Sequence, residues 1–114
     1  MNHNAATIVS QFIENLNNEN FSDARNALHD DFVFEGVLGR REGADLYIKE
    51  MSKMKLKYEV QQSFEAGAEI SLWYLIDMGG KKILSSGWYH TDGGRIRSLK
   101  VVFDPRPLLD SGQQ

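Results

Sequence analysis

The sequence predicts an α+β domain in which helices precede a set of antiparallel strands. Two observations support this fold class. Apolar residues recur with helical spacing near the N-terminus and again after residue 43, whereas the chain beyond residue 55 alternates with a period of two. Glycines separate the alternating segments, which is typical of hairpins because glycine accepts the positive φ of tight turns. The predicted order of elements is α-α-β-α-β-β-β-β.

Three helices are predicted in the first half of the chain. The first helix ends at residues 17–20, which are polar. The second helix begins at Phe21 or Ser22 and stops near residue 30, and Ser22 is a plausible N-cap. The third follows a polar loop at 36–43, which contains three glycines. The apolar stripe of the first helix consists of Ile8, Val9, Phe12, Ile13 and Leu16. That of the third consists of Ala44, Tyr47, Ile48 and Met51, with Met54 as a further candidate.

One short strand is predicted before the third helix and four strands are predicted after it. The short strand covers residues 32–35, which are aromatic and β-branched apart from Glu35. The four later strands are predicted at 56–65, 69–78, 82–91 and 95–104, and prolines end the last of them. We interpret 1–114 as a single domain with a short frayed tail at 105–114.

Composition excludes several classes of function. The chain has no cysteine, which excludes disulfides, thiolate catalysis and zinc–thiolate sites and favours a reducing, cytoplasmic location. Lysine and arginine are scattered and the formal net charge is -3, so a nucleic-acid partner is not expected. Neither a secretory signal nor a membrane-spanning stretch is evident, and no membrane association is expected.

The predicted strands are apolar on both faces, which bears on assembly. In residues 70–76 both alternating sets are largely apolar, and in 99–103 little wholly polar surface remains. Helices can cover only one face of such a sheet, so the other face would expose apolar side chains. A second copy of the chain is the simplest cover, and we expect a homodimer through the convex sheet face.

The order of elements resembles that of the nuclear-transport-factor-2-like (NTF2-like) superfamily, in particular its SnoaL-like and ketosteroid-isomerase-like members. The sequence resembles this superfamily most clearly at residues 12–17, 27–36 and 92–104. The resemblance extends from about residue 6 to residue 103. It implies a cystatin-like cone, in which a curved antiparallel sheet wraps around the helices and leaves an open mouth. Members of this superfamily bind small, mostly apolar molecules and include isomerases, cyclases, dehydratases and hydrolases, whereas others only bind proteins, so the fold does not settle the function.

The resemblance does not extend to the ketosteroid isomerase residues. That activity needs a carboxylate base and two protonated donors, a tyrosine and a carboxylic acid. The tyrosine position falls on Phe12, the base position on Gly36 and the donor acid on Ser86. A shift of one residue would place Glu35 at the base position, but the tyrosine would still be absent. Ketosteroid isomerase activity is therefore not expected.

A small apolar or aromatic ligand is the expected partner of the cone pocket. If Ser86 faces the cavity, alternation places Leu84, Trp88 and His90 on the same side. The predicted pocket consists of Phe12, Phe34, Tyr47, Met51, Trp73, Ser86 and Trp88. The same side chains would also form an ordinary solid core, and the pattern does not exclude this alternative.

Three side chains are candidates for acid/base chemistry, and each has a simpler interpretation. His90 has an ordinary pKa of about 6.5 and exchanges protons near neutrality, but it is equally a partly exposed residue at a strand end. Glu35 is either a carboxylate at the pocket mouth or a solvated strand residue, and Asp104 caps the strand end or pairs with Arg106. No metal site or cofactor is expected, because residues 29–31 have metal-binding side chains that point in different directions.

Two functions follow from these observations. The first is a SnoaL-like protein that binds a small hydrophobic molecule, with or without acid/base catalysis through His90. The second is a non-catalytic dimeric module that recognises another protein. Whether the protein is an enzyme stays open at this point.

Overall fold

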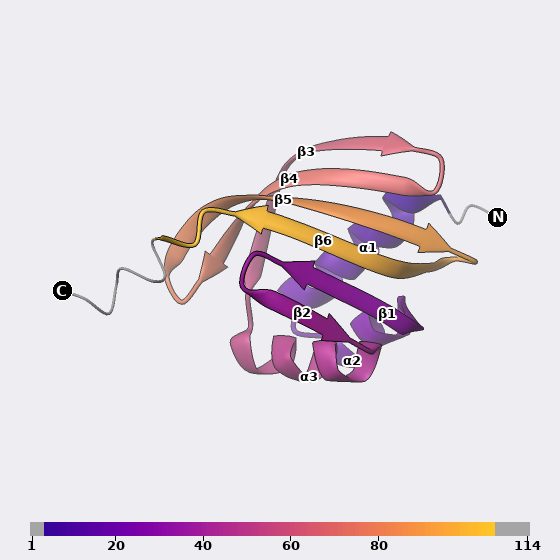
Figure 1. Ribbon diagram of the computed structural model, residues 1–114, viewed down its shortest axis with the longest axis horizontal. Helices are drawn as coiled ribbons and strands as arrows, with labels where there is room; N and C mark the ends of the chain where they lie inside the picture. The colour runs from indigo at the N-terminus through magenta and orange to yellow at the C-terminus, as the bar shows by residue number, and fades with distance from the viewer. Residues whose placement is uncertain (1–3, 107–114) are drawn as a thin grey trace.

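Three helices pack against the concave face of a curved sheet in the computed structural model, which describes residues 4–106 (Figure 1). The helices are α1 (Ala5–Asn17), α2 (Phe21–Asn26) and α3 (Ala44–Met54). The strands are β1 (Leu28–Gly36), β2 (Gly39–Glu42), β3 (Lys57–Ala66), β4 (Glu69–Met78), β5 (Lys81–Asp92) and β6 (Arg95–Phe103). The predicted α+β class is confirmed, while most of the predicted tail lies outside the described residues.

The six strands form one sheet in the order β2-β1-β6-β5-β4-β3. Neighbouring strands are antiparallel except for β1 and β6, which run parallel. The four strands β3 to β6 correspond closely to the four strands predicted after the third helix, and β4 has the predicted bounds. Within the described chain the longest helix, α1, has 13 residues, and no helix combines the length and apolarity needed to cross a membrane.

The helices begin and end where local chemistry favours it. The Asn4 side chain caps α1 by accepting a hydrogen bond from the Thr7 backbone N–H at 2.8 Å. At the C-terminal end of α3, Lys55 adopts the left-handed conformation with φ 51°. The predicted apolar stripes of α1 and α3 are confirmed for nine residues, which are buried in the core, whereas the further candidate Met54 is exposed.

The region between α2 and α3 differs from the prediction. The second helix ends at Asn26 rather than near residue 30, because Leu28 already pairs with Ile96 of β6 and the Ile96 N–H donates to the Ala27 carbonyl at 2.8 Å. This pairing with a distant strand overrides the local polarity of residues 29–31. The strand β2 was predicted as loop, since all four of its residues are exposed and leave no alternation to detect.

The inward face of β5 is opposite to the predicted one. Its buried residues are Ile83, Ser85, Gly87, Tyr89 and Thr91. Leu84, Ser86, Trp88 and His90, which were predicted to face the cavity, instead lie on the outer face. Both alternating sets contain large apolar residues, and a shift of one residue exchanges the faces of a strand, so hydrophobicity alone does not decide between them.

A close approach between two neighbouring strands explains this orientation. The Tyr74 side chain of β4 lies over Gly87 of β5, where a Cβ atom would overlap the Tyr74 hydroxyl. That hydroxyl is hydrogen-bonded to the Tyr89 hydroxyl at 2.9 Å in the core. Only a residue without a side chain leaves room for the Tyr74 ring, so Gly87 and its neighbours Ser85 and Tyr89 turn inward.

Replacing Gly87 with alanine tests this packing. We expect Gly87→Ala to destabilise the fold by about 1–3 kcal/mol in urea denaturation, because the added methyl group must displace a buried tyrosine. Tyr74→Phe removes the overlapping hydroxyl, so the cost of Gly87→Ala should be smaller in that background. Equal costs in both backgrounds would contradict the proposed contact.

Candidate functional site

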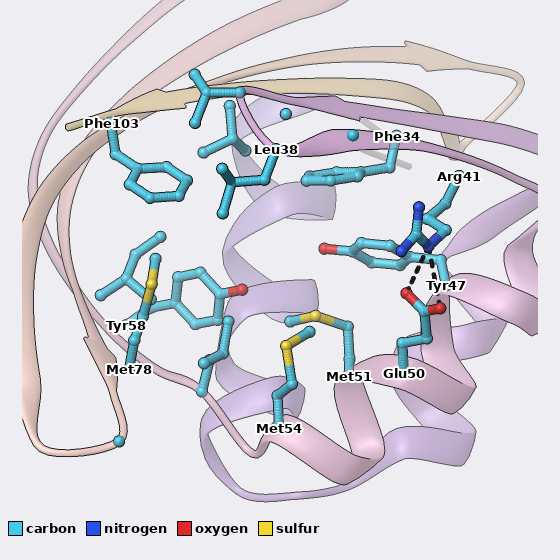
Figure 2. A pocket seen from close by; sticks show the side chains of 17 residues that line it. Phe34, Leu38, Arg41, Tyr47, Glu50, Met51, Met54, Tyr58, Met78 and Phe103 are labelled. Atoms are coloured by element: carbon cyan, nitrogen blue, oxygen red, sulfur yellow. Dashed lines mark hydrogen bonds and ion pairs between the residues drawn. The ribbon is translucent and has the colours of Figure 1, made fainter. Parts of the chain in front are cut away.

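A cavity of about 420 Å³ lies between α3, the β1–β2 hairpin and one end of strands β3, β4 and β6 (Figure 2). Its lining is mostly apolar and includes Phe34, Met51, Ile76, Val101 and Phe103. The exposed side chains of Val37, Leu38 and Met54 lie at its mouth, so the cavity is open to solvent. Its volume falls within the range of about 300–1,000 Å³ that is usual for small-molecule sites.

One face of α3 supplies much of the cavity wall. Tyr47, Glu50, Met51 and Met54 are spaced three, four and seven residues from Tyr47 and therefore share that face. Figure 2 shows both methionine side chains extending from the helix toward the middle of the cavity. Their flexible, unbranched side chains adapt readily to the shape of an apolar guest.

Two tyrosine hydroxyls lie among the apolar side chains of the cavity. Tyr47 of α3 and Tyr58 of β3 approach from opposite sides, and their hydroxyls point toward one another (Figure 2). The Tyr47 ring contacts Phe32 and Phe34, with centroid distances of 4.9 Å and 5.2 Å. These ring contacts restrict the direction in which the Tyr47 hydroxyl can point.

The backbone of Tyr58 is held by a side chain of α1. The Asn17 amide accepts from the Tyr58 N–H at 2.7 Å and donates to the Tyr58 carbonyl at 2.9 Å. The Tyr58 ring also packs edge-on against Tyr74, with centroids 5.3 Å apart. Contacts from α1 and β4 thus hold the backbone and the ring of Tyr58 in place.

Burial keeps these two hydroxyls protonated. Burial raises the pKa of both Tyr47 and Tyr58 far above the ordinary tyrosine value of about 10. A hydrogen-bonding interaction between them also lowers the pKa of Tyr47 and raises that of Tyr58. Over the physiological pH range both groups are therefore neutral donors.

The charged groups lining the cavity form one ion pair. Arg41 of β2 donates through Nε to both carboxylate oxygens of Glu50, at 2.8 Å and 3.0 Å. Both side chains are partly exposed at the edge of the cavity, where water screens them. Because Arg41 and Glu50 neutralise one another, the interior presents phenol hydroxyls and apolar surface rather than net charge.

The structure places only part of the predicted pocket around this cavity. Phe34, Tyr47 and Met51 line it. Phe12 is fully buried in the core beneath the sheet and does not line the cavity. The prediction is wrong for Trp73, Ser86 and Trp88. All three lie on the outer face of the sheet, where the two tryptophans are 45% and 47% exposed.

The three predicted acid/base residues also lie away from the cavity. His90 is on the outer face, with Nδ1 3.8 Å from a Glu69 carboxylate oxygen. Glu35 pairs with Arg40 at 3.4 Å and with Lys100 at 3.7 Å. Asp104 follows the last strand, and its hydrogen bonds with Arg106 lower its pKa to about 2. None of the three lines the cavity. His90 faces outward because the buried face of β5 is the opposite of the predicted one, while Glu35 and Asp104 pair with cationic side chains outside the cavity.

Sequence reasoning missed several lining residues. Tyr58 stands at the start of a strand that is otherwise mostly exposed, so its burial was not evident. Glu50 and Met54 share a helical face with Tyr47, and that spacing was a usable signal. Leu38 and Arg41 reach the cavity only because residues 36–42 form a hairpin, which exposed and charged side chains conceal.

Comparison with solved structures identifies the family. A crystal structure of an NTF2-like protein of unknown function from Cytophaga hutchinsonii ATCC 33406 superposes with a TM-score of 0.93 and is 46% identical in sequence. The match covers 96% of this chain and 97% of that protein. The chain belongs to the NTF2-like family. No protein-family model and no curated protein matches the sequence.

Other structures share the NTF2-like fold at lower identity. An epoxide hydrolase of M. tuberculosis described as LEH-like is 25% identical, with a TM-score of 0.75 and coverage of 96% of this chain and 95% of that one. A protein of unknown function with a cystatin-like fold from Methylobium petroleophilum PM1 is 11% identical, with a TM-score of 0.79 over 87% of this chain and 74% of that one. The latter match confirms the cystatin-like fold that the sequence resemblance implies.

The raised tyrosine pKa values predict how the folded protein titrates. All four tyrosines of the sequence are buried or partly buried and have raised pKa values, so phenolate absorbance at 295 nm should not develop near pH 10 while the protein is folded. Unfolded tyrosines ionise near pH 10, so the stabilisation is fully present below that pH. Above it, stability should fall by about 1.4 kcal/mol per pH unit for each tyrosine. Ionisation near pH 10 without loss of the circular dichroism of the fold would contradict this burial.

Proposed function

We propose that this protein binds a small, predominantly apolar molecule in the cavity between α3 and the β1–β2 hairpin. The observation that carries the proposal is the lining, in which apolar side chains surround two protonated tyrosine hydroxyls and the charged pair lies at the edge. Such a combination is typical of small-molecule sites, where apolar surface supplies affinity and a few polar groups supply orientation. The cysteine-free sequence favours a cytoplasmic setting for this activity.

Binding rather than catalysis is the function that the geometry supports best. The M. tuberculosis LEH-like epoxide hydrolase shares the fold, which supports a family in which some members are enzymes. In this cavity, however, the carboxylate is Glu50, and its two oxygens are engaged by Arg41. Proton transfer by His90, Glu35 or Asp104 is not part of the proposal, because these side chains do not line the cavity.

Filling the mouth of the cavity tests the binding proposal. Met54 is 52% exposed and its side chain reaches into the cavity, so Met54→Trp should place an indole ring where the ligand binds. We expect apolar ketones and aromatic compounds to raise the melting temperature of the wild type, and the shift to shrink at least severalfold in Met54→Trp. The matched control is Leu46→Trp, because Leu46 is 44% exposed on the same helix and does not line the cavity.

Two outcomes would count against binding. If a broad panel of apolar compounds leaves the melting temperature of the wild type unchanged, the result contradicts a ligand-accessible cavity. Equal shifts in Met54→Trp and Leu46→Trp would place the bound compounds somewhere other than this cavity.

We also propose that a second copy of the chain covers the outer, convex face of the sheet. Large apolar side chains with exposures between 45% and 60% gather on this face, namely Phe64, Trp73, Leu84, Trp88 and Val102. Patches of this kind usually mark interfaces.

Charged side chains border this apolar patch. Lys100 stacks on Trp88 at 5.2 Å and pairs with Glu35, and Glu69 accepts a hydrogen bond from the Trp88 ring at 2.6 Å. Charges of both signs therefore border the patch, which favours pairing of a surface with itself around a two-fold axis.

Introducing charge into this patch tests the homodimer. We expect the wild type to have a dimeric mass in light scattering at micromolar concentration, and Trp73→Glu to be monomeric because a carboxylate would be buried without a partner. Leu46→Glu introduces the same charge at a similarly exposed apolar residue on α3 and should leave the dimer intact. A monomeric wild type would contradict the proposal, and it would favour the alternative that this face recognises another protein.

A further inference from the structure

The tyrosine hydroxyls in the cavity define the chemical class of the ligand. We propose that Tyr47 and Tyr58 together bind one uncharged carbonyl oxygen, so that the ligand is an apolar ketone rather than a hydrocarbon or a carboxylate. This inference rests on the proposed binding function, and it assigns a specificity-determining role to these two residues.

The two hydroxyls have one hydrogen more than they can use between themselves. The two hydroxyls point toward one another in the cavity (Figure 2), and within residues 4–106 neither is hydrogen-bonded to any other group. Each phenol carries one donor hydrogen, so when one hydroxyl donates to the other, a hydrogen remains for an acceptor in the cavity. A ligand oxygen that lies between the two hydroxyls can receive both hydrogens.

A carbonyl oxygen fits this arrangement better than other oxygen groups. Its two lone pairs accept two hydrogen bonds, and it brings no hydrogen that would need an acceptor of its own. An alcohol oxygen that accepted from both hydroxyls would still carry a hydrogen of its own, and the surrounding lining is mostly apolar. A carboxylate would place a charge in an apolar cavity where the cation, Arg41, is already engaged by Glu50.

The donors are held in place before any ligand binds. Phe32 and Phe34 contact the Tyr47 ring, and Asn17 holds the backbone of Tyr58 through two hydrogen bonds. A pair of donors that is already oriented loses little conformational entropy when an oxygen arrives. Tyr74 and Tyr89 offer a natural contrast, because their hydroxyls bond to each other at 2.9 Å and neither residue lines the cavity.

The test compares 1-tetralone with tetralin, two bicyclic compounds that differ by a carbonyl oxygen. Dissociation constants for both are measured by calorimetry for the wild type and for Tyr47→Phe/Tyr58→Phe. We expect the preference for the ketone, expressed as the ratio of the two constants, to fall roughly 10-fold in the double variant, while the tetralin constant changes less than about twofold. Tyr89→Phe, which removes a buried hydroxyl outside the cavity, should leave the ratio unchanged.

The outcomes separate this inference from the binding proposal. If both compounds bind and the ratio is the same in the wild type and the double variant, the carbonyl site is overturned and the binding proposal stands. If neither compound binds to the wild type, both are overturned. Should the double variant fail to fold, the infrared carbonyl band of 1-tetralone bound to the wild type provides the decision. Two hydrogen bonds move that band to lower frequency than in hexane, and an unshifted band would overturn the inference.

Discussion

The arrangement of the inner and outer faces depends on the contact between Tyr74 and Gly87. The Tyr74 ring occupies the space that a side chain at residue 87 would fill, so β5 must present its glycine to the core. Because side chains alternate along a strand, this one contact also turns Tyr89 inward and Trp88 outward. The tyrosines therefore gather within the cone and the tryptophans gather on its outside.

This separation gives the two faces of the sheet different chemistry. The inner face combines phenol hydroxyls with apolar side chains, and it bounds a cavity that is closed on one side by the core and open beside α3. The outer face carries indole rings, short polar side chains and paired charges. Ligand binding and self-association are thus proposed for opposite faces, and a dimer would leave the cavity mouth accessible.

Most of the fold was predictable because its signals are local. The stripe of α1 and the turns at Gly79 and Gly93, both with positive φ, are visible in the sequence and were confirmed. The β1–β6 parallel pair and the strand β2 were not predicted, since both depend on partners far away in the sequence or on exposed residues without periodicity. For the site, Phe34, Tyr47 and Met51 were identified, whereas Tyr58 and the pair of Arg41 with Glu50 were not.

The sequence was sufficient to predict the class of fold, the helix faces and the positions of the strand pairs, because these follow from periodicity and turn chemistry within short windows. It did not determine which face of β5 is buried, because both alternating sets have apolar members and a one-residue shift leaves the pattern equally acceptable. The packing of the folded chain resolves this ambiguity, through the space that Tyr74 needs over Gly87. It thereby placed Trp88 and His90 outside the cone and left Tyr47 and Tyr58 facing one another inside it.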